Sequence, residues 1–142
     1  MNKISVLFLC THNSARSQMA EGLLNHLYGD RYEAFSAGTE KTRVHPLAVE
    51  AMQRIGIDIS GHQSKIVDRF GGRQFDVVVT VCDLARATCP YVPAKKERLH
   101  WSLEDPASAT GTKQQQLAVF EKTRDEIRKR IIEQFGADSF TT

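Results

Sequence analysis

A cysteine and an arginine with five residues between them carry the clearest chemical signal in this sequence. Cys10 and Arg16 form this pair, and Ser17 follows directly. An apolar run at residues 4–9 precedes the pair and a helical pattern follows it. A strand, a tight loop and a helix N-terminus point successive backbone N–H groups at one spot, where the helix dipole adds positive charge. Such a loop binds an oxyanion, with Arg16 as a bidentate clamp.

The same loop favours the thiolate form of Cys10, which is the nucleophilic form. The sequence therefore predicts a thiolate beneath a bound tetrahedral oxyanion. In the alternative interpretation, Cys10 is a small core residue and Arg16 a solvated helix residue, but the flanking strand and helix disfavour it. Asn13 has a structural role in this hypothesis, because asparagine tolerates the left-handed backbone that tight loops need.

Composition indicates one soluble domain that spans residues 1–142. The net charge of +2 is too small and too scattered to favour nucleic acid as a partner. No apolar run is long enough to span a membrane, and the N-terminus does not have the pattern of a signal peptide. We therefore expect a cytoplasmic protein without membrane contact. The odd count of 3 cysteines favours catalytic or redox roles over a structural disulfide framework.

Strands and helices alternate along the chain. Strands are predicted at residues 4–10, 32–37, 76–81 and 98–101, and helices at 15–28, 46–55 and 112–135. Ser14 is expected to cap the first helix, and Thr112 with Gln115 forms a capping box for the last. This alternation predicts an α/β fold with a parallel sheet, whose ligands bind beyond the carboxyl ends of the strands. Cys10 and Cys82 end strands and Asp105 lies just after one, so we expect all three on one rim.

The sequence resembles the thioredoxin-coupled arsenate reductases, which have the fold of the low-molecular-weight tyrosine phosphatases. Matching stretches cover residues 10–21 (CTHNSARSQMAE), 36–38, 56–60, 79–82, 89–90, 100–101 and 105–106. The phosphatases share the loop that begins at Cys10, whereas the spaced pair of Cys82 and Cys89 marks the reductases. The resemblance implies a three-layer αβα fold with a four-stranded parallel sheet in the order 2-1-3-4.

The resemblance also implies a reaction sequence. Arsenate binds to the backbone N–H groups and the arginine of the loop, formed by Thr11, His12, Asn13, Ser14, Ala15 and Arg16. The Cys10 thiolate attacks arsenic, Ser17 donates a hydrogen bond to that thiolate, and Asp105 protonates the departing oxygen. Cys82 then attacks the Cys10 adduct, and arsenite leaves.

Cys89 next attacks Cys82, and thioredoxin reduces the resulting disulfide. The sequence leaves glutaredoxin open as the donor. Residues 82–89 cannot form this disulfide as a continuous helix, because seven residues of helix rise by about 10.5 Å. We therefore predict a segment that is helical when reduced and looped when oxidised. The resemblance implies no organic cofactor, and we expect a monomer.

Two positions depart from the family pattern. His12 stands where many members have glycine, so the loop backbone there must suit a side chain. Lys65 replaces an acidic ligand of the potassium site that some members have, although Asn13, Glu21 and Ser36 match. Because a lysine ammonium can replace the cation beside Glu21, we predict no metal site and no activation by potassium.

Two other functions fit parts of the sequence. A tyrosine phosphatase would hydrolyse phosphomonoesters through Cys10, Arg16 and Asp105 without the other two cysteines. Such an enzyme favours aromatic walls around a phenyl ring, but Ala107 and Ser108 follow the Asp-Pro pair here. A non-catalytic oxyanion-binding or redox-sensing module would not require the complete set of nucleophile, arginine and acid that this chain retains.

Overall fold

The computed structural model describes residues 3–10, 12–13, 15–40, 42–81 and 92–136. Four strands form one parallel sheet in the order β2-β1-β3-β4, as expected. The strands are β1 (Ile4–Cys10), β2 (Tyr32–Gly38), β3 (Phe75–Thr80) and β4 (Ala94–His100). The helices are α1 (Arg16–Tyr28), α2 (Pro46–Gln53) and α4 (Lys113–Phe135), with short 3-10 helices η1 (Val67–Phe70) and η2 (Pro106–Ser108).

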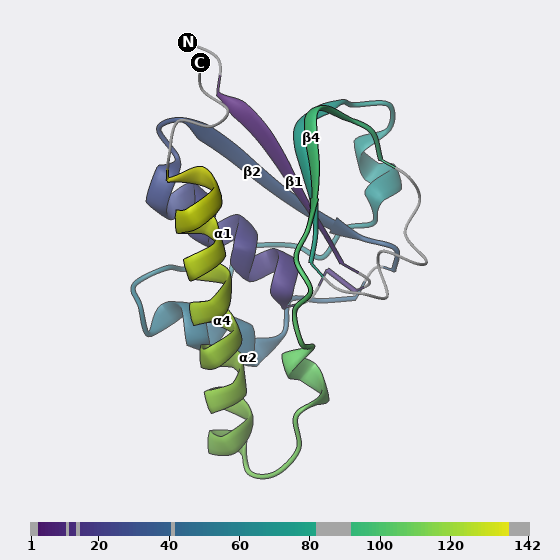
Figure 1. Ribbon diagram of the computed structural model, residues 1–142. Coiled ribbons are helices and arrows are strands. Elements are labelled where there is room, and N and C mark those ends of the chain that lie inside the picture. Colours follow the sequence, from purple (N-terminus) through teal and green to yellow (C-terminus); the bar gives the residue numbers. More distant parts are fainter. Residues whose placement is uncertain (1–2, 11, 14, 41, 82–91, 137–142) are drawn as a thin grey trace.

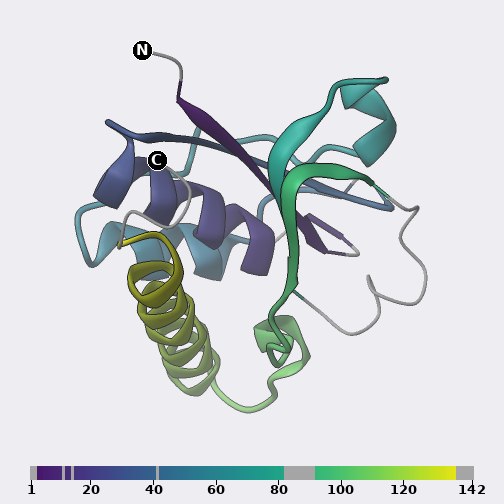
Figure 2. The same ribbon diagram turned by 45° about the horizontal axis from the view of Figure 1, so that its top comes forward.

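The sheet separates two layers. Figures 1 and 2 show α1, α2 and α4 together on one face of the sheet and η1 on the other. The larger hydrophobic core lies on the three-helix face, and a smaller cluster lies beneath η1. The apolar residues that α4 turns towards the sheet are buried: Leu117, Phe120, Ile127, Ile131 and Phe135. The predicted three-layer α/β architecture is therefore confirmed.

The two inner strands, β1 and β3, are nearly continuous in apolar residues because they are covered on both faces. The edge strand β4 behaves differently. It begins at Ala94 rather than at the predicted residue 98, and its middle is exposed and charged. Charged side chains, lysine above all, are typical of edge strands because they discourage pairing with other chains. Because these residues are charged, an apolar pattern in the sequence does not reveal where the strand begins.

The last helix has the predicted ends, whereas α2 ends at Gln53 rather than at the predicted residue 55. The capping box of Thr112 and Gln115 is present, and α4 ends before Gly136. The N-cap residue of α1 is Ala15, which makes no side-chain capping hydrogen bond, and the expected cap Ser14 lies outside the described residues. N–H groups of an uncapped first turn are suited to an anion. Within the described residues, no helix has both the length and the apolar character needed to cross a bilayer.

Candidate oxyanion site

Cys10 is the last residue of β1, and its side chain is buried at the carboxyl edge of the sheet. The backbone N–H of Asn13 donates to Sγ of Cys10 at 3.2 Å, and Oγ of Ser17 lies 2.9 Å from the same sulfur. Asn13 has a φ of 50°, so the predicted left-handed conformation is confirmed. The turn at Asn13 is what directs its N–H back towards the sulfur. Two donors from the loop and α1 therefore converge on one thiol.

The neighbours of Ser17 leave its hydroxyl able to donate to Cys10. Oδ1 of Asn13 accepts from the backbone N–H of Lys65 at 2.7 Å and from Nε2 of Gln18 at 2.9 Å. The amide nitrogen of Asn13 must then face Oγ of Ser17, at 2.8 Å, and donate to it. Because Ser17 accepts this bond, its own hydroxyl hydrogen is free to point at the sulfur. The arrangement stabilises a thiolate.

Gln18 extends this chain of hydrogen bonds beneath the loop. Its side chain is fully buried, and its Nε2 also lies 3.1 Å from the carbonyl of Asn13 and 2.9 Å from that of Gln63. These acceptors identify the nitrogen, so Oε1 faces Nδ1 of His62 at 3.0 Å. Nδ1 of His62 also lies 3.2 Å from a carboxylate oxygen of Glu21, so this nitrogen carries hydrogen. Donation thus runs from His62 towards Cys10.

Sequence reasoning missed Gln18 and His62. The only local signal was a glutamine in the second position after Arg16, and polar residues in that part of a helix are common. His62 reaches the loop through the connection between α2 and β3, 44 residues along the chain from Gln18. No short motif joins the two residues, so only the fold reveals that they belong to the site.

The arginine expected to clamp the oxyanion is held in place on the rim of the sheet. Arg16 is buried, and its Nη1 donates to the carbonyl of Leu103 at 3.1 Å. Its Nη2 lies 3.6 Å from Oδ2 of Asp105. The other oxygen of Asp105 accepts from the backbone N–H of Ala107 and caps η2. The structure therefore brings Asp105 to Arg16, and one carboxylate oxygen of Asp105 faces the site.

His12 lies on the outer side of the loop. Its Nδ1 is 3.2 Å from Oε2 of Glu40, and both side chains are largely exposed. Its carbonyl accepts from the hydroxyls of Thr42 and Ser64 at 2.9 and 3.0 Å. The backbone of His12 does not have a positive φ, so a side chain is accommodated at this position without strain. These contacts join the loop to the connections that follow β2 and α2.

Lys65 lies beside Glu21, as the sequence suggested. Its Nζ is 3.9 Å from Oε1 of Glu21, and the same oxygen accepts from the hydroxyl of Ser36 at 2.8 Å. Burial lowers the pKa of Lys65 below its usual value, while Glu21 partly opposes this shift. No group of three or more histidine, cysteine, aspartate or glutamate side chains arranged for a metal ion occurs among the described residues.

A third histidine, His45, lies at the N-terminus of α2. Nδ1 of His45 accepts from the backbone N–H of Leu47 at 3.1 Å, and its ring packs on Phe120 with 4.6 Å between ring centroids. Burial lowers the pKa of His45, an effect that the carboxylate of Asp105 partly opposes. The histidine is therefore a neutral helix cap in the folded protein near pH 7.

The structure brings together Cys10, Asn13, Arg16, Ser17 and Asp105, with His12 and Ala15 in the same loop. Thr11, Ser14, Cys82 and Cys89 lie outside the described residues, as does the predicted switch at residues 82–89. The expected approach of Cys82 to Cys10 therefore stays a prediction. That approach requires β1 and β3 to be neighbours in the sheet, and the two strands do pair in parallel.

This parallel sheet, with a cysteine and an arginine framing a loop after its first strand, defines a phosphatase-like class of oxyanion-binding domains. The family model for "Low molecular weight phosphotyrosine protein phosphatase" matches residues 5–138. The chain belongs to this family. It is 50% identical over 131 residues to an arsenate reductase of Halalkalibacterium halodurans, covering 92% of this chain and 94% of that protein.

Solved structures agree with this family. An arsenate reductase in the phosphate binding state is similar with a TM-score of 0.75 and 33% identity, over 92% of this chain and 95% of the other. The thioredoxin-dependent arsenate reductase of Corynebacterium glutamicum is similar with a TM-score of 0.67 and 31% identity, over 92% of this chain and 61% of the other. Within the family, the chain therefore groups with proteins named arsenate reductase.

Proposed function

We propose that this protein reduces arsenate to arsenite in the cytoplasm, as a single-domain monomer. The geometry around Cys10 supports nucleophilic attack on an oxyanion: the N–H of Asn13 donates to the sulfur, Oγ of Ser17 lies 2.9 Å from it, and Arg16 lies on the same rim. The names of the relatives point to the same substrate. Arsenate binds to the loop through backbone N–H groups and the guanidinium of Arg16.

The reaction begins when the thiolate of Cys10 attacks arsenic and an arsenate oxygen leaves as water. Asp105 supplies the proton for that oxygen. Its Oδ1 accepts from Ala107, whereas its Oδ2 faces Arg16 and the site. Cys82 then attacks the sulfur of the adduct. A Cys10–Cys82 disulfide forms, the sulfur–arsenic bond breaks, and its electron pair reduces arsenic from the pentavalent to the trivalent state.

A second exchange regenerates the nucleophile. Cys89 attacks Cys82, releases Cys10 as a thiolate and leaves a Cys82–Cys89 disulfide. Thioredoxin reduces this disulfide and restores both thiols. The thioredoxin dependence of the relative from Corynebacterium glutamicum supports this choice of donor. Arsenate-dependent oxidation of NADPH with thioredoxin and its reductase, compared with glutathione and glutaredoxin, tests it.

A phosphatase activity through Cys10 is the second candidate, because the family model is that of a phosphotyrosine phosphatase. The variant Cys82→Ser separates the two functions. We expect it to abolish arsenate turnover while it leaves phosphate binding and any hydrolysis of p-nitrophenyl phosphate intact. If Cys82→Ser still turns over arsenate at the wild-type rate, the three-cysteine relay is wrong. If the wild type hydrolyses the ester but does not reduce arsenate, the protein is a phosphatase.

A further inference from the structure

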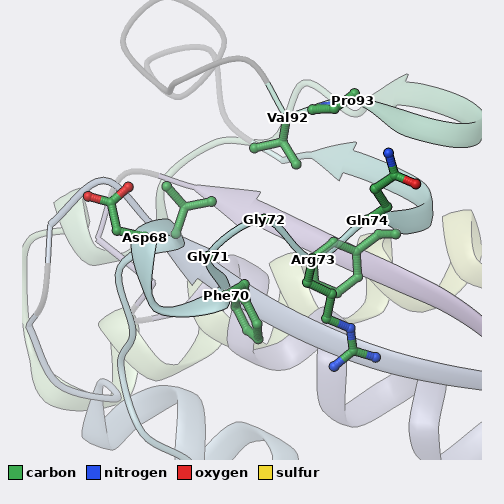
Figure 3. A pocket seen from close by; sticks show the side chains of 10 residues that line it. Asp68, Phe70, Gly71, Gly72, Arg73, Gln74, Val92 and Pro93 are labelled. Carbon is green, nitrogen blue, oxygen red and sulfur yellow. The ribbon is translucent and has the colours of Figure 1, made fainter.

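A groove lies on the face of the sheet opposite the three helices, between η1 and the start of β4 (Figure 3). Its cavity volume is about 240 Å³, and apolar side chains line much of it: Val67, Phe70, Val92 and Pro93. Val67, Phe70 and Val92 pack only partly against the smaller core and stay partly accessible. We call this feature the η1–β4 groove.

The charges around the η1–β4 groove are predominantly positive. Arg73 lies at its rim, where the guanidinium packs 4.3 Å from the ring centroid of Phe35 and its Nη2 lies 3.9 Å from Oε1 of Glu33. The adjoining edge of β4 exposes Lys95, Lys96 and Arg98, whereas its only acidic residue is Glu97. Asp68 is the single carboxylate among the lining residues. A partner that covers this surface therefore benefits from an apolar contact and an acidic flank.

The sequence places this groove close to the proposed exchange chemistry. Val92 comes three residues after Cys89 in the sequence. Three residues of extended chain span at most about 11 Å. Redox encounters between proteins bury up to roughly 600 Å² on each partner, which corresponds to a disc of about 14 Å radius. A protein that presents a thiol to Cys89 from this face therefore also covers Val92 and Pro93.

We infer that the η1–β4 groove, together with the basic edge of β4, is the docking surface for the protein reductant. The partner is a dithiol protein of the thioredoxin kind, with apolar surface beside its reactive cysteine and acidic residues on its flank. This inference rests on the proposed function and adds to it the surface through which electrons enter. A small dithiol such as dithiothreitol needs no such surface.

The test is a double substitution at the docking surface, Pro93→Glu in the groove with Lys95→Glu on the adjoining edge of β4. Both residues are exposed, so the fold should tolerate the change. We expect the KM for thioredoxin in arsenate reduction to rise about tenfold, because a carboxylate enters an apolar contact and a complementary charge is reversed. The rate with dithiothreitol should stay within about twofold of wild type. The matched control, Gln114→Glu with Lys122→Glu, makes the same change in charge on exposed positions of α4.

Each outcome decides the matter. A KM for thioredoxin that is unchanged, or that rises equally in the α4 control, overturns the inference. If the wild type self-associates and the groove variant dissociates with an unchanged KM, a second copy of the chain occupies the groove and the inference is likewise wrong. If the wild type reduces no arsenate even with dithiothreitol, the proposed function fails and the docking role with it.

A milder variant guards against misfolding. Lys95→Glu alone should raise the KM for thioredoxin about threefold, because one attractive charge on the surface is reversed. The KM should also depend less on the salt concentration. If Lys95→Glu has the same KM for thioredoxin as wild type and the same dependence of that KM on salt, the basic edge of β4 takes no part in docking.

Discussion

Removing the hydroxyl of Ser17 should lower the reactivity of Cys10 as a nucleophile. The variant Ser17→Ala deletes a donor that lies 2.9 Å from the sulfur and removes the acceptor of the Asn13 side chain. A hydrogen bond to a charged group contributes about 1.5–3 kcal/mol, and every 1.4 kcal/mol corresponds to about a factor of ten. We therefore expect Cys10 to react as a nucleophile about tenfold more slowly in Ser17→Ala.

The assay is alkylation by iodoacetamide in a Cys82→Ser, Cys89→Ser background, where Cys10 is the remaining cysteine. At about pH 6 the rate of alkylation should fall about tenfold in Ser17→Ala. Ser17→Thr, which keeps the hydroxyl, should restore much of the rate.

The control is Ser60→Ala, which removes an exposed hydroxyl that bonds only the side chain of Asp58. Its alkylation rate should match that of the background. If folded Ser17→Ala reacts as fast as this control at every pH, then the hydrogen-bond direction derived for the loop is wrong.

Three further predictions concern other parts of the molecule. Burial lowers the pKa of His45 below 6.5, so the unfolded chain binds a proton at this histidine more readily than the folded chain does. The free energy of unfolding therefore falls as the pH drops below about 6.5. His45→Asn, which keeps a capping oxygen, should lose less stability than wild type between about pH 7.5 and pH 5.5 in urea unfolding, and an equal loss in both contradicts this explanation. Gly22→Ala should cost about 1–2 kcal/mol in the same assay, since its Cβ would lie 2.7 Å from a methyl of Ile59, whereas Gly61→Ala, which meets open space, should cost little. Exchanging sodium for potassium at fixed ionic strength should not raise the rate of arsenate reduction, because the ammonium of Lys65 replaces the cation; a clear increase would refute this.

Local patterns were sufficient for most of the fold. The apolar run before Cys10 and the capping box at Thr112 each depend on neighbours within a few residues, and both are present as predicted. The strand order could be predicted only through the resemblance. The start of β4 could not be predicted, because an exposed edge strand needs no apolar side chains.

The supporting part of the site was beyond sequence reasoning. His62 and the backbone of Lys65 approach the loop from another connection, and the carbonyl of Leu103 orients Arg16 from beyond β4. A backbone carbonyl carries no sequence signal, and a buried histidine has the same letter as an exposed one. Such partners become visible only when distant segments are placed side by side.

By itself, the sequence determined the chemical class of this protein. Cys10 and Arg16 are joined by a short loop, so the chain alone brings a thiol and a guanidinium to one oxyanion. Only the tertiary structure decided the direction of the hydrogen bond from Asn13 to Ser17 beside that thiol. The side chain of Asn13 donates to Ser17 because its oxygen already accepts from Gln18 and Lys65. Since one of these donors comes from a separate segment, the polarity of the loop is a property of the fold.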